Sequence, residues 1–273
     1  MKRIYLEITN SCDLDCPFCS EPKGHSFMSL ADIDRYTDEI RPYCGYIYLH
    51  VLGEPLLHPC IDEILDILER KDFRLQLVTN GVHLGEHPDL INHKCLRKLS
   101  VSLHAVDRLN IGTAYFRTVD ELIERHGDTV LELRFFDPAN LSGDTLGYLQ
   151  SLKERYELLE TGKKNSYEIS KDVYVLFEGM FEWPDLKLPF ISYEGKCHGF
   201  IDQLAILCDG RVTSCCLDAR GFNCFGDMKK MSFKDIIESD TYLKSCKELK
   251  KGILSHELCA RCSYRLRFSH THD

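Results

Sequence analysis

Short apolar segments alternate with amphipathic stretches along the first two thirds of the chain. Six segments are rich in β-branched, aromatic and leucine residues, as strands typically are, and they cover residues 4–8, 46–51, 73–78, 98–103, 130–136 and 173–177. Between them, apolar residues recur at helical spacing in three groups: Leu30, Ile33, Thr37 and Ile40; Ile61, Ile64, Leu65 and Leu68; and Leu146, Leu149, Leu152 and Tyr156. Strands that alternate with helices pair in parallel through right-handed crossovers, so we expect functional groups at the carboxyl ends of these strands.

Polar residues mark two helix starts and one turn. Ser29 with Asp32 resembles a capping box in acidic form, and Thr118 with Glu121 fits the capping-box pattern directly. The sequence Thr79-Asn80-Gly81 follows the third strand and predicts a turn, because Asn-Gly favours positive φ.

The pattern changes after about Pro189. The chain from Gly195 onward contains eight of the fourteen cysteines, and Asp209-Gly210 stands between the apolar runs 204–208 and 211–215. Asp-Gly between such runs predicts a β-hairpin. A helix is expected at residues 232–238, and this order does not continue the strand-helix alternation. We therefore expect two domains, residues 1–190 and residues 191–273.

Composition narrows the class of protein. The net charge of −9 argues against a nucleic acid partner, because binding a phosphate backbone needs a basic surface. No run of residues has the length and apolar character of a membrane span, and Glu7 interrupts the N-terminal segment where a secretory signal would need an apolar core. We expect a cytoplasmic protein without membrane contact, in which clustered cysteines bind metal in preference to forming disulfides.

Three cysteines stand just beyond the first predicted strand. Cys12, Cys16 and Cys19 have the spacing C-x3-C-x2-C. Three thiolates can hold three corners of a four-iron cluster and leave the fourth iron open to a ligand that is not protein. A structural zinc site usually has four ligands in pairs, and this triplet lacks a nearby fourth. Buried structural cysteines, the other alternative, rarely keep a regular spacing.

The segment from Glu7 to Cys19, EITNSCDLDCPFC, resembles the signature of the radical SAM superfamily. This resemblance implies a partial (β/α)6 TIM-like barrel, which is followed here by a small α+β cysteine-rich domain with a β-hairpin. It also implies a 4Fe-4S cluster that binds S-adenosylmethionine and a reductant such as a flavodoxin or ferredoxin. By resemblance, the reduced cluster cleaves the cofactor to a 5′-deoxyadenosyl radical, which abstracts hydrogen from a substrate.

The same resemblance assigns contacts to S-adenosylmethionine. Leu52-Gly53-Glu54-Pro55 resembles the Gly-Gly-Glu-Pro motif of the family, with Leu52 in place of the first glycine. It implies that Glu54 and neighbouring backbone groups of Gly53 and Pro55 hold the methionyl ammonium. The resemblance further places Phe18 near the adenine, Ser102 near the ribose or carboxylate, and Arg134 near the methionyl carboxylate. Polar residues at strand ends are often only surface groups, and Ser102 and Arg134 keep that alternative.

A second set of cysteines lies in the C-terminal region. The segment Gly210 to Cys215 resembles the G-x4-C element of the SPASM and twitch families, and Cys259-Ala260-Arg261-Cys262 follows it. Together with Cys197 these cysteines offer four ligands for one auxiliary 4Fe-4S cluster. A structural zinc ion could use the same four thiolates, and Cys216 could replace Cys215. Because no cysteine follows Cys262, we expect the shorter twitch type with a single auxiliary cluster.

Other residues are candidates for catalysis. By resemblance to epimerases of the superfamily, Cys208, Cys216 or Cys224 could donate a hydrogen atom to a substrate radical, although free cysteines are commonly inert buried residues. His104 directly follows the fourth predicted strand and could serve as an acid or base. A hydrogen-bonded structural histidine is the alternative for His104.

The length and the single auxiliary cluster resemble the aminocyclitol dehydrogenases of this superfamily. The expected reaction is therefore oxidation of a small sugar-like or cyclitol-like molecule, with the auxiliary cluster accepting the second electron. An epimerase and a peptide-modifying enzyme are alternatives that use the same first step. A non-catalytic metal-binding or cluster-binding protein is the alternative from another class, and it would not need the Gly53-Glu54-Pro55 element.

Overall fold

The computed structural model describes residues 1–16, 19, 24–103, 106–109 and 111–268. Contacts divide the chain into two compact units, and the first combines the two ends of the sequence. Unit 1 contains Met1–Gly53 and Phe181–Asp273, and unit 2 contains Glu54–Met180. None of the helices in the described part of the chain has the length and apolar character of a membrane span.

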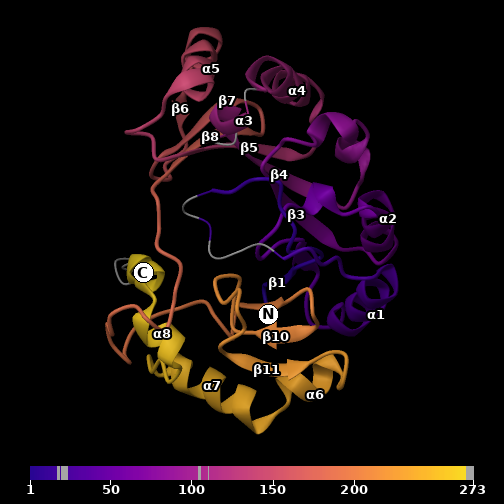
Figure 1. Cartoon of the computed structure of the whole chain (residues 1–273), viewed down its shortest axis with the longest axis vertical. Helices are drawn as coiled ribbons and strands as arrows, with labels where there is room; N and C mark the ends of the chain where they lie inside the picture. The colour runs from indigo at the N-terminus through magenta and orange to yellow at the C-terminus, as the bar shows by residue number, and fades with distance from the viewer. Residues whose placement is uncertain (17–18, 20–23, 104–105, 110, 269–273) are drawn as a thin grey trace. The chain divides into compact units, whose positions relative to one another are not determined.

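Unit 1 contains five neighbouring strands of the sheet, in the order β11-β10-β9-β1-β2. Strand β1 (Arg3–Leu6) pairs in parallel with β2 (Tyr46–Tyr48) on one edge and with β9 (Gln203–Ile206) on the other. Strands β10 (Arg211–Thr213) and β11 (Cys224–Asp227) extend the sheet in antiparallel fashion beyond β9 (Figure 1). The C-terminal region therefore adds strands directly to the first strand of the chain, which the sequence pattern did not predict.

The hairpin predicted around Asp209-Gly210 is confirmed. Residue Gly210 has φ +95°, and the Gly210 N–H donates to the carbonyl of Leu207 at 2.8 Å to close the turn between β9 and β10. Positive φ favours glycine because it has no Cβ. The side chain of a larger residue would also meet the Tyr36 hydroxyl, which lies 2.8 Å from the position of an added Cβ.

The helices of unit 1 begin at polar caps. Helix α1 (Leu30–Ile40) begins where the Ser29 side chain accepts a hydrogen bond from the Asp32 N–H at 3.1 Å, which confirms the predicted acidic capping box. Ser232 caps α6 (Phe233–Ile237) in the same way, within the predicted helix at residues 232–238. The sequence pattern did not single out the remaining helical segments, which are α7 (Asp240–Lys250), α8 (Glu257–Arg261) and the 3-10 helix η5 (Ser263–Phe268).

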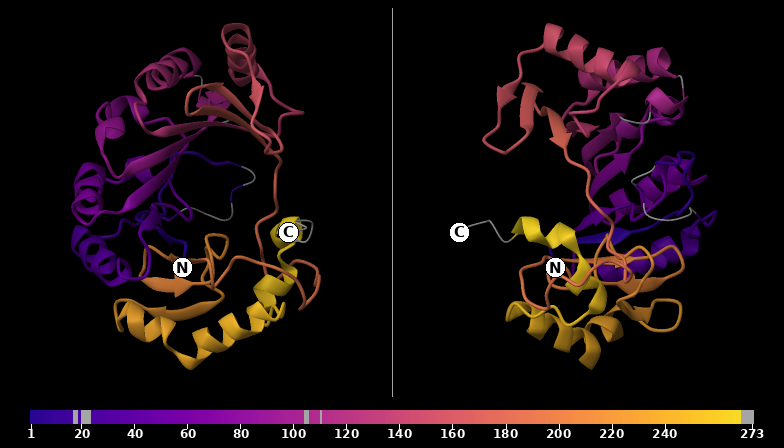
Figure 2. Two further views of the ribbon diagram at one scale, coloured as in Figure 1. Left: turned by 180° about the vertical axis from the view of Figure 1, so that it is seen from behind. Right: turned by 60° about the vertical axis from the view of Figure 1, so that its left-hand side comes forward.

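Unit 2 contains the other four predicted strands. Strands β3 (Arg74–Thr79), β4 (Leu96–Ser102), β5 (Val130–Phe136) and β8 (Val173–Glu178) are parallel neighbours in that order. Two short strands, β6 (Leu159–Glu160) and β7 (Ser166–Ser170), continue the sheet in antiparallel fashion beside β8 (Figure 2). The sequence pattern missed this pair, which lies within the connection from the fifth to the sixth predicted strand.

The connections in unit 2 are less regular than the predicted alternation. The predicted helix at residues 61–68 is confirmed as α2 (Ile61–Arg70), which follows the 3-10 helix η1 (Pro55–Leu57). Strands β3 and β4 are joined through two 3-10 helices, η2 (Leu84–Glu86) and η3 (Leu90–Asn92). Helices α3 (Val106–Leu109), α4 (Gly112–Arg125) and α5 (Gly143–Arg155) complete the unit.

One prediction about these helices is wrong, and the helix predicted from the spacing of Leu146, Leu149 and Leu152 is confirmed as α5. Thr118 and Glu121 lie inside α4, which begins at Gly112, and the Thr118 hydroxyl donates to the carbonyl of Ala114 instead of capping. Leu146 is 37% exposed, because α5 buries the face formed by Thr145, Tyr148, Leu149 and Leu152. Tyr148 stacks on Phe116 of α4 with ring centroids 4.0 Å apart, and this aromatic contact sets the buried face in place of the leucine spacing.

Candidate functional site

The cysteine triplet lies in a loop whose base is closed by hydrogen bonds. The Ile8 carbonyl accepts from the Met28 N–H at 2.8 Å, and the Asn10 side chain accepts from the Ser26 N–H at 2.9 Å. Cys12, Cys16 and Cys19 are all partly exposed within this loop, and the Cys19 N–H donates to the carbonyl of Cys16 at 2.9 Å. Phe18 lies outside the described residues.

Gly53 lies against the base of this loop. It has φ +76°, and an added Cβ would lie 2.4 Å from the Thr9 carbonyl oxygen and 2.9 Å from that of Ser11. Only glycine fits such a close approach of two backbones. The predicted motif therefore has a structural reason for its glycine: the turn after β2 packs directly on the residues that lead into the cysteine loop.

The buried carboxylate of Glu7 ties this turn to β1. Its two oxygens accept from the Leu52 N–H and from the Cys208 N–H, each at 3.0 Å, and the residue is 3% exposed. Burial raises the pKa of Glu7 to about 7, although the two N–H donors act in the opposite direction. Sequence reasoning missed this role, for which the only signal was a charged residue at the end of an apolar strand.

Glu54 has protein partners for both of its carboxylate oxygens. One oxygen accepts from the Leu56 N–H at 3.1 Å and the Thr79 hydroxyl at 2.7 Å, and the other accepts from the Asn80 N–H at 2.6 Å. The side chain thereby joins η1 to the end of β3 and is 2% exposed. The turn predicted at Thr79-Asn80-Gly81 is confirmed, with Gly81 at φ +81°. The contact of the Glu54 motif with the methionyl ammonium stays a prediction. The backbone groups of the motif are best suited to make that contact.

Ser102 and Arg134 are direct register partners at the carboxyl ends of β4 and β5. The Arg134 guanidinium forms a two-point ion pair with Glu178 of β8, with N–O distances of 3.2 and 2.5 Å, and lies over the ring of Phe136. Ser102 is buried, and its carbonyl accepts a hydrogen bond from the Tyr115 hydroxyl at 3.3 Å. The structure brings these two predicted residues together, and their contacts with S-adenosylmethionine stay predictions.

More charged groups lie on the same face of this sheet. Lys98 forms an ion pair with Glu132, whose other oxygen accepts from the Ser100 hydroxyl at 2.7 Å. The opposite face is apolar, and its strand residues are fully buried: Leu75, Leu77, Leu99, Val101, Leu131, Leu133, Val173 and Val175. Parallel strands that are buried on both faces are apolar throughout, so this sheet differs from them in having charged side chains on one of its faces.

The four cysteines of the second set lie together in unit 1. Burial raises the pKa of the Cys215, Cys259 and Cys262 thiols, and the nearby Cys197 thiol acts in the same direction on all three. Each thiol also receives at least one N–H hydrogen bond, such as that from Gly199 to Cys197 at 3.4 Å. N–H donors stabilise the thiolate form, so the site fits a metal group that binds four thiolates.

The distance between the thiolate ligands differs between a site for one zinc ion and a site for a four-iron cluster. Among the described residues, no three His, Cys, Asp or Glu side chains have the spacing of a site for a single metal ion. Thiolates on one zinc ion lie ~3.8 Å apart in a tetrahedron of 2.3 Å bonds. The ligands of a four-iron cluster are bound to separate irons and lie farther apart.

Cys215 and its neighbour Cys216 face different surroundings. Cys215 is grouped with Cys197 and Cys259, whereas the Cys216 thiol lies beside the Tyr5 hydroxyl and Arg3. Burial raises the pKa of Cys216 to about 11, while Tyr5 and Arg3 lower it. The contacts favour Cys215 as the cluster ligand and leave Cys216 beside the ring of Tyr5, which stacks on Tyr48 with centroids 4.5 Å apart.

Residues 6–184 match the model of the radical SAM superfamily. The chain belongs to the radical SAM superfamily. Residues 197–263 match the SPASM iron-sulfur cluster-binding domain. The cofactors of this radical SAM enzyme are therefore S-adenosylmethionine and a 4Fe-4S cluster, and its C-terminal region is a domain for auxiliary iron-sulfur binding. The domain boundary expected at residues 190 and 191 falls between the two matches and stays a prediction.

Curated relatives of the radical SAM chain have several activities. It is 23% identical to a GTP 3',8-cyclase of Aquifex aeolicus over 92% of this chain and 94% of that protein. It is 31% identical to a PqqA peptide cyclase of Gluconobacter oxydans over 30% of this chain and 24% of that protein. These names cover different substrates, so similarity alone does not select a reaction.

Solved structures share the fold. The structure of BtrN in complex with AdoMet and 2-DOIA matches with a TM-score of 0.58 and 17% identity, over 96% of this chain and 92% of that chain. The structure of anSMEcpe with bound AdoMet and Kp18Cys peptide matches with a TM-score of 0.60 and 12% identity, over 100% and 91%. The predicted fold class, an α/β fold of the partial-barrel type with a cysteine-rich C-terminal region, is confirmed.

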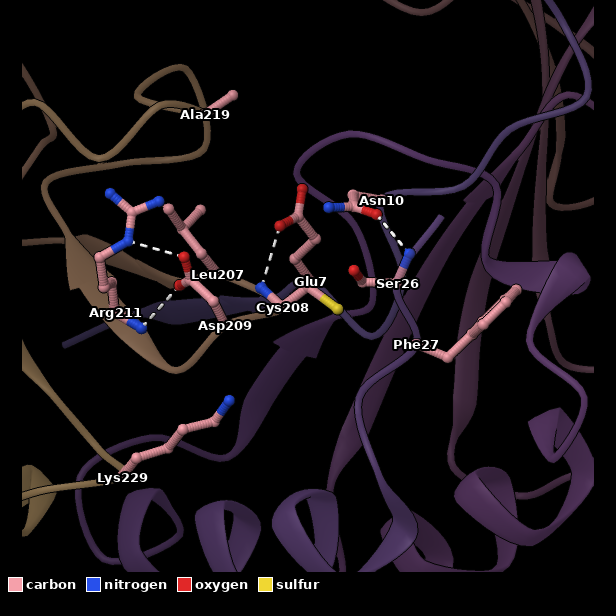
Figure 3. A pocket seen from close by; sticks show the side chains of 10 residues that line it. All are labelled: Glu7, Asn10, Ser26, Phe27, Leu207, Cys208, Asp209, Arg211, Ala219 and Lys229. Carbon is pink, nitrogen blue, oxygen red and sulfur yellow. Dashed lines mark hydrogen bonds and ion pairs between the residues drawn. The ribbon is translucent and has the colours of Figure 1, made fainter. Parts of the chain in front are cut away.

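Two further candidates for catalysis, Cys208 and Cys224, differ in their exposure. The Cys208 thiol is buried 3.9 Å from the Ile8 carbonyl, and Cys224 is exposed, with its sulfur 3.3 Å from the Gly226 carbonyl. His104 lies outside the described residues. Cys208 also lines a cavity of about 310 Å³ in unit 1, together with Glu7, Asn10, Ser26, Phe27, Leu207, Asp209, Arg211, Ala219 and Lys229 (Figure 3).

Proposed function

We propose that this radical SAM enzyme oxidises a small polar molecule, of the sugar or cyclitol class, as a dehydrogenase. The observation that carries the proposal is the complete set of four thiols, Cys197, Cys215, Cys259 and Cys262, beside the N–H donors that stabilise thiolates. Four protein ligands saturate one cluster and leave no iron open for substrate binding. A saturated cluster suits electron acceptance, which is what an oxidation needs after hydrogen abstraction.

The chain's own residues place the groups that react. When bound, S-adenosylmethionine on the first cluster supplies a hydrogen-abstracting radical, and the second cluster supplies an acceptor for one further electron. We propose that Cys12, Cys16 and Cys19 hold the first cluster, with Gly53 keeping the cofactor turn against the base of their loop. Ser102 and Arg134 would contact the cofactor from β4 and β5. His104 stays the candidate for taking the proton that an oxidised carbinol releases.

A polar substrate is supported by the charged face of unit 2. Lys98, Glu132, Arg134 and Glu178 lie on that face, with side chains 15 to 33% exposed. Hydroxyl groups both donate and accept hydrogen bonds, and paired cations and carboxylates can satisfy both roles. The face is less suited to an apolar substrate, whose binding would leave these charges without water.

An epimerase is the second candidate, and Cys216 favours it. The Cys216 thiol lies beside the Tyr5 hydroxyl, and it also interacts with the nearby Cys197 and Cys215 thiols. Burial keeps this thiol protonated, since its pKa is raised to about 11. A protonated thiol can give a hydrogen atom to a substrate radical. The names of the PqqA peptide cyclase and of the peptide-bound anSMEcpe support a third candidate, peptide modification.

Anaerobic reconstitution followed by a 5′-deoxyadenosine assay with dithionite tests the common first step. We expect the wild-type protein to release 5′-deoxyadenosine and the Cys12→Ala variant to release none. Cys60→Ala, which replaces a thiol outside both sets, is the matched control and should behave as wild type. A protein that loads iron but never cleaves S-adenosylmethionine would contradict the enzyme proposal and favour a non-catalytic cluster carrier.

The two leading reactions differ in product and in solvent hydrogen. A dehydrogenase yields an oxidised product and needs no thiol donor, so Cys216→Ala should retain at least half of the wild-type turnover. An epimerase incorporates deuterium from D2O into an unoxidised product and should lose more than about tenfold in turnover with Cys216→Ala. Mass spectrometry of candidate sugars, cyclitols and peptides after turnover in D2O separates the two. Deuterated, unoxidised product would contradict the dehydrogenase proposal.

A further inference from the structure

A buried side-chain amide contacts one thiol of the second cysteine set. Asn223 is 5% exposed, and its Nδ2 donates to the Cys259 sulfur at 3.4 Å and to the Ser214 hydroxyl at 3.1 Å. The two N–H bonds of the amide therefore have two acceptors. Cys259 is a predicted cluster ligand, so the amide is directed at the atom that would bind iron.

A buried carboxylate fixes this amide in place. Asp218 is 1% exposed and accepts from the Asn223 N–H at 2.9 Å and the Phe222 N–H at 2.8 Å. It also accepts from the hydroxyls of Ser214, at 3.2 Å, and Thr213. A buried carboxylate is costly unless it is hydrogen-bonded, and four donors from the segment 213–223 supply those bonds. The result is a rigid loop that presents Asn223 to Cys259.

The other three thiols of the set receive donors from the backbone, and the Ser214 hydroxyl also lies 4.0 Å from the Cys215 sulfur. Gly199 and His198 donate to Cys197, Leu217 donates to Cys215, and Tyr264 and Arg265 donate to Cys262. These donors remain when a side chain is replaced. The contact of Asn223 with Cys259 differs, because a single substitution removes it and leaves the four thiols intact.

We propose that Asn223 raises the reduction potential of the auxiliary cluster by donating an N–H hydrogen bond to the Cys259 thiolate. A reduced cluster carries one more negative charge than an oxidised one, so a donor to its sulfur stabilises the reduced form more. Hydrogen bonds to cluster sulfurs are one of the determinants of iron-sulfur potentials. The inference rests on the proposed auxiliary cluster, and it makes Asn223 a positioning residue for the cluster's role as electron acceptor.

The test measures the auxiliary cluster by itself. A background variant in which Cys12, Cys16 and Cys19 are all changed to alanine retains only the second of the two cysteine sets. The midpoint potential of the cluster in this variant is measured by EPR during an anaerobic redox titration. In this background, Asn223→Leu removes the donor at similar volume. We expect about a tenfold lower equilibrium constant for reduction, which is a midpoint about 59 mV more negative for one electron.

Two further variants keep the test decisive. Asn223→Val also removes the donor without adding an ionisable group, and it should lower the midpoint about as far as Asn223→Leu. Ser245→Ala removes a buried hydroxyl of α7 that contacts Thr241 and His256, and it should leave the midpoint unchanged. Full iron content with an unchanged midpoint in either Asn223 variant would overturn the inference.

Metal analysis of the cysteine-to-alanine background distinguishes a failure of the tuning role of Asn223 from a failure of the proposed function. About four irons per chain in the cysteine-to-alanine background support the auxiliary cluster on which the inference rests. Zinc in place of iron in that background would overturn the auxiliary cluster and the tuning role together. Iron with an unshifted potential overturns the tuning role alone.

Discussion

Glu7 shows how one side chain can join segments that are distant in sequence. Its carboxylate accepts N–H bonds from Leu52 and Cys208, so it links β1 to the turn before Gly53 and to the end of β9. Nothing in the local sequence predicts this, because both partners are backbone groups whose positions depend on the fold. Cys208 follows Glu7 by 201 residues. The sequence identified the cysteines and glycine by spacing, but it could not identify a residue whose role depends on long-range contacts.

The stability of the protein should depend on the ionisation of Glu7. Burial raises its pKa from 4.5 to about 7, so between these values the folded protein holds a proton that the unfolded chain releases. Stability is then fully present below about pH 4.5, falls as the pH rises through this window and levels off above it. One pKa unit corresponds to about 1.4 kcal/mol, so the loss is at most about 3 kcal/mol. In Glu7→Gln this slope should be absent.

Urea unfolding of both proteins between pH 5 and pH 8 measures the effect. The difference in free energy of unfolding between wild type and Glu7→Gln should change with pH, to the disadvantage of the wild type as the pH rises. Glu63→Gln, which changes an exposed carboxylate in the first turn of α2, is a control for general charge effects. Parallel pH profiles for wild type and Glu7→Gln would show that Glu7 titrates as an ordinary exposed glutamate.

At the scale of elements, the alternation of strands and helices could be predicted from the sequence, whereas the departures from it could not. The six predicted strands, the cap at Ser29 and the helix at residues 232–238 follow from local composition, because each is decided by residues that are close in sequence. The antiparallel pair β6–β7 was missed, since its exposed, polar strands lack an apolar pattern. Leu146 is exposed although it belongs to the helical spacing that predicts α5, because the stacking of Phe116 on Tyr148 decides the buried face.

The 3-10 helix η5 depends on one buried cation. Arg265 is 3% exposed and donates to three carbonyl oxygens, those of Ser192 at 2.8 Å, Glu194 at 3.0 Å and Cys259 at 3.0 Å. It therefore joins η5 to the segment before Cys197 and to α8. Arg265→Ala would remove this donor from all three carbonyls, of which that of Cys259 also accepts from the Cys262 N–H. We expect a loss of about 3 kcal/mol in unfolding free energy and reduced iron in the auxiliary site.

Urea unfolding and iron analysis of Arg265→Ala and Arg265→Lys check this role. A lysine keeps the charge but cannot reproduce the fork of guanidinium donors, so it should rescue only part of the stability. Arg267→Ala removes a neighbouring cation that lies over the ring of Tyr264, and this matched control should lose less than about 1 kcal/mol. Equal stability of Arg265→Ala and Arg267→Ala would contradict the proposed role of Arg265.

At the scale of the whole molecule, the two ends of the chain form one unit. Strand β9 pairs with β1 over four residues, and Ile4, Leu6, Leu204 and Ile206 in these strands are fully buried. Both predicted cysteine sets lie in this unit, although one is near the N-terminus and the other is in the C-terminal region. The sequence suggested a boundary near residue 190, because composition changes there. Strand pairing across that boundary is a tertiary feature that composition does not encode.

This organisation predicts that residues 1–190 do not fold alone. Such a fragment would lose β9, and with it the hydrogen bonds of one edge of β1 and the Cys208 N–H that binds Glu7. The apolar side chains that β9 covers would be exposed to water at a cost of about 25 cal/mol for each Å². We expect the fragment to lack a cooperative thermal transition by circular dichroism and to be cleaved rapidly by protease within residues 1–53. A chain that ends at Phe268 retains every strand of unit 1 and should unfold as the full chain does. The fragment of residues 1–190 could instead melt cooperatively and still bind iron through Cys12, Cys16 and Cys19. That result would show that the first domain folds independently and that β1 does not need β9 for folding.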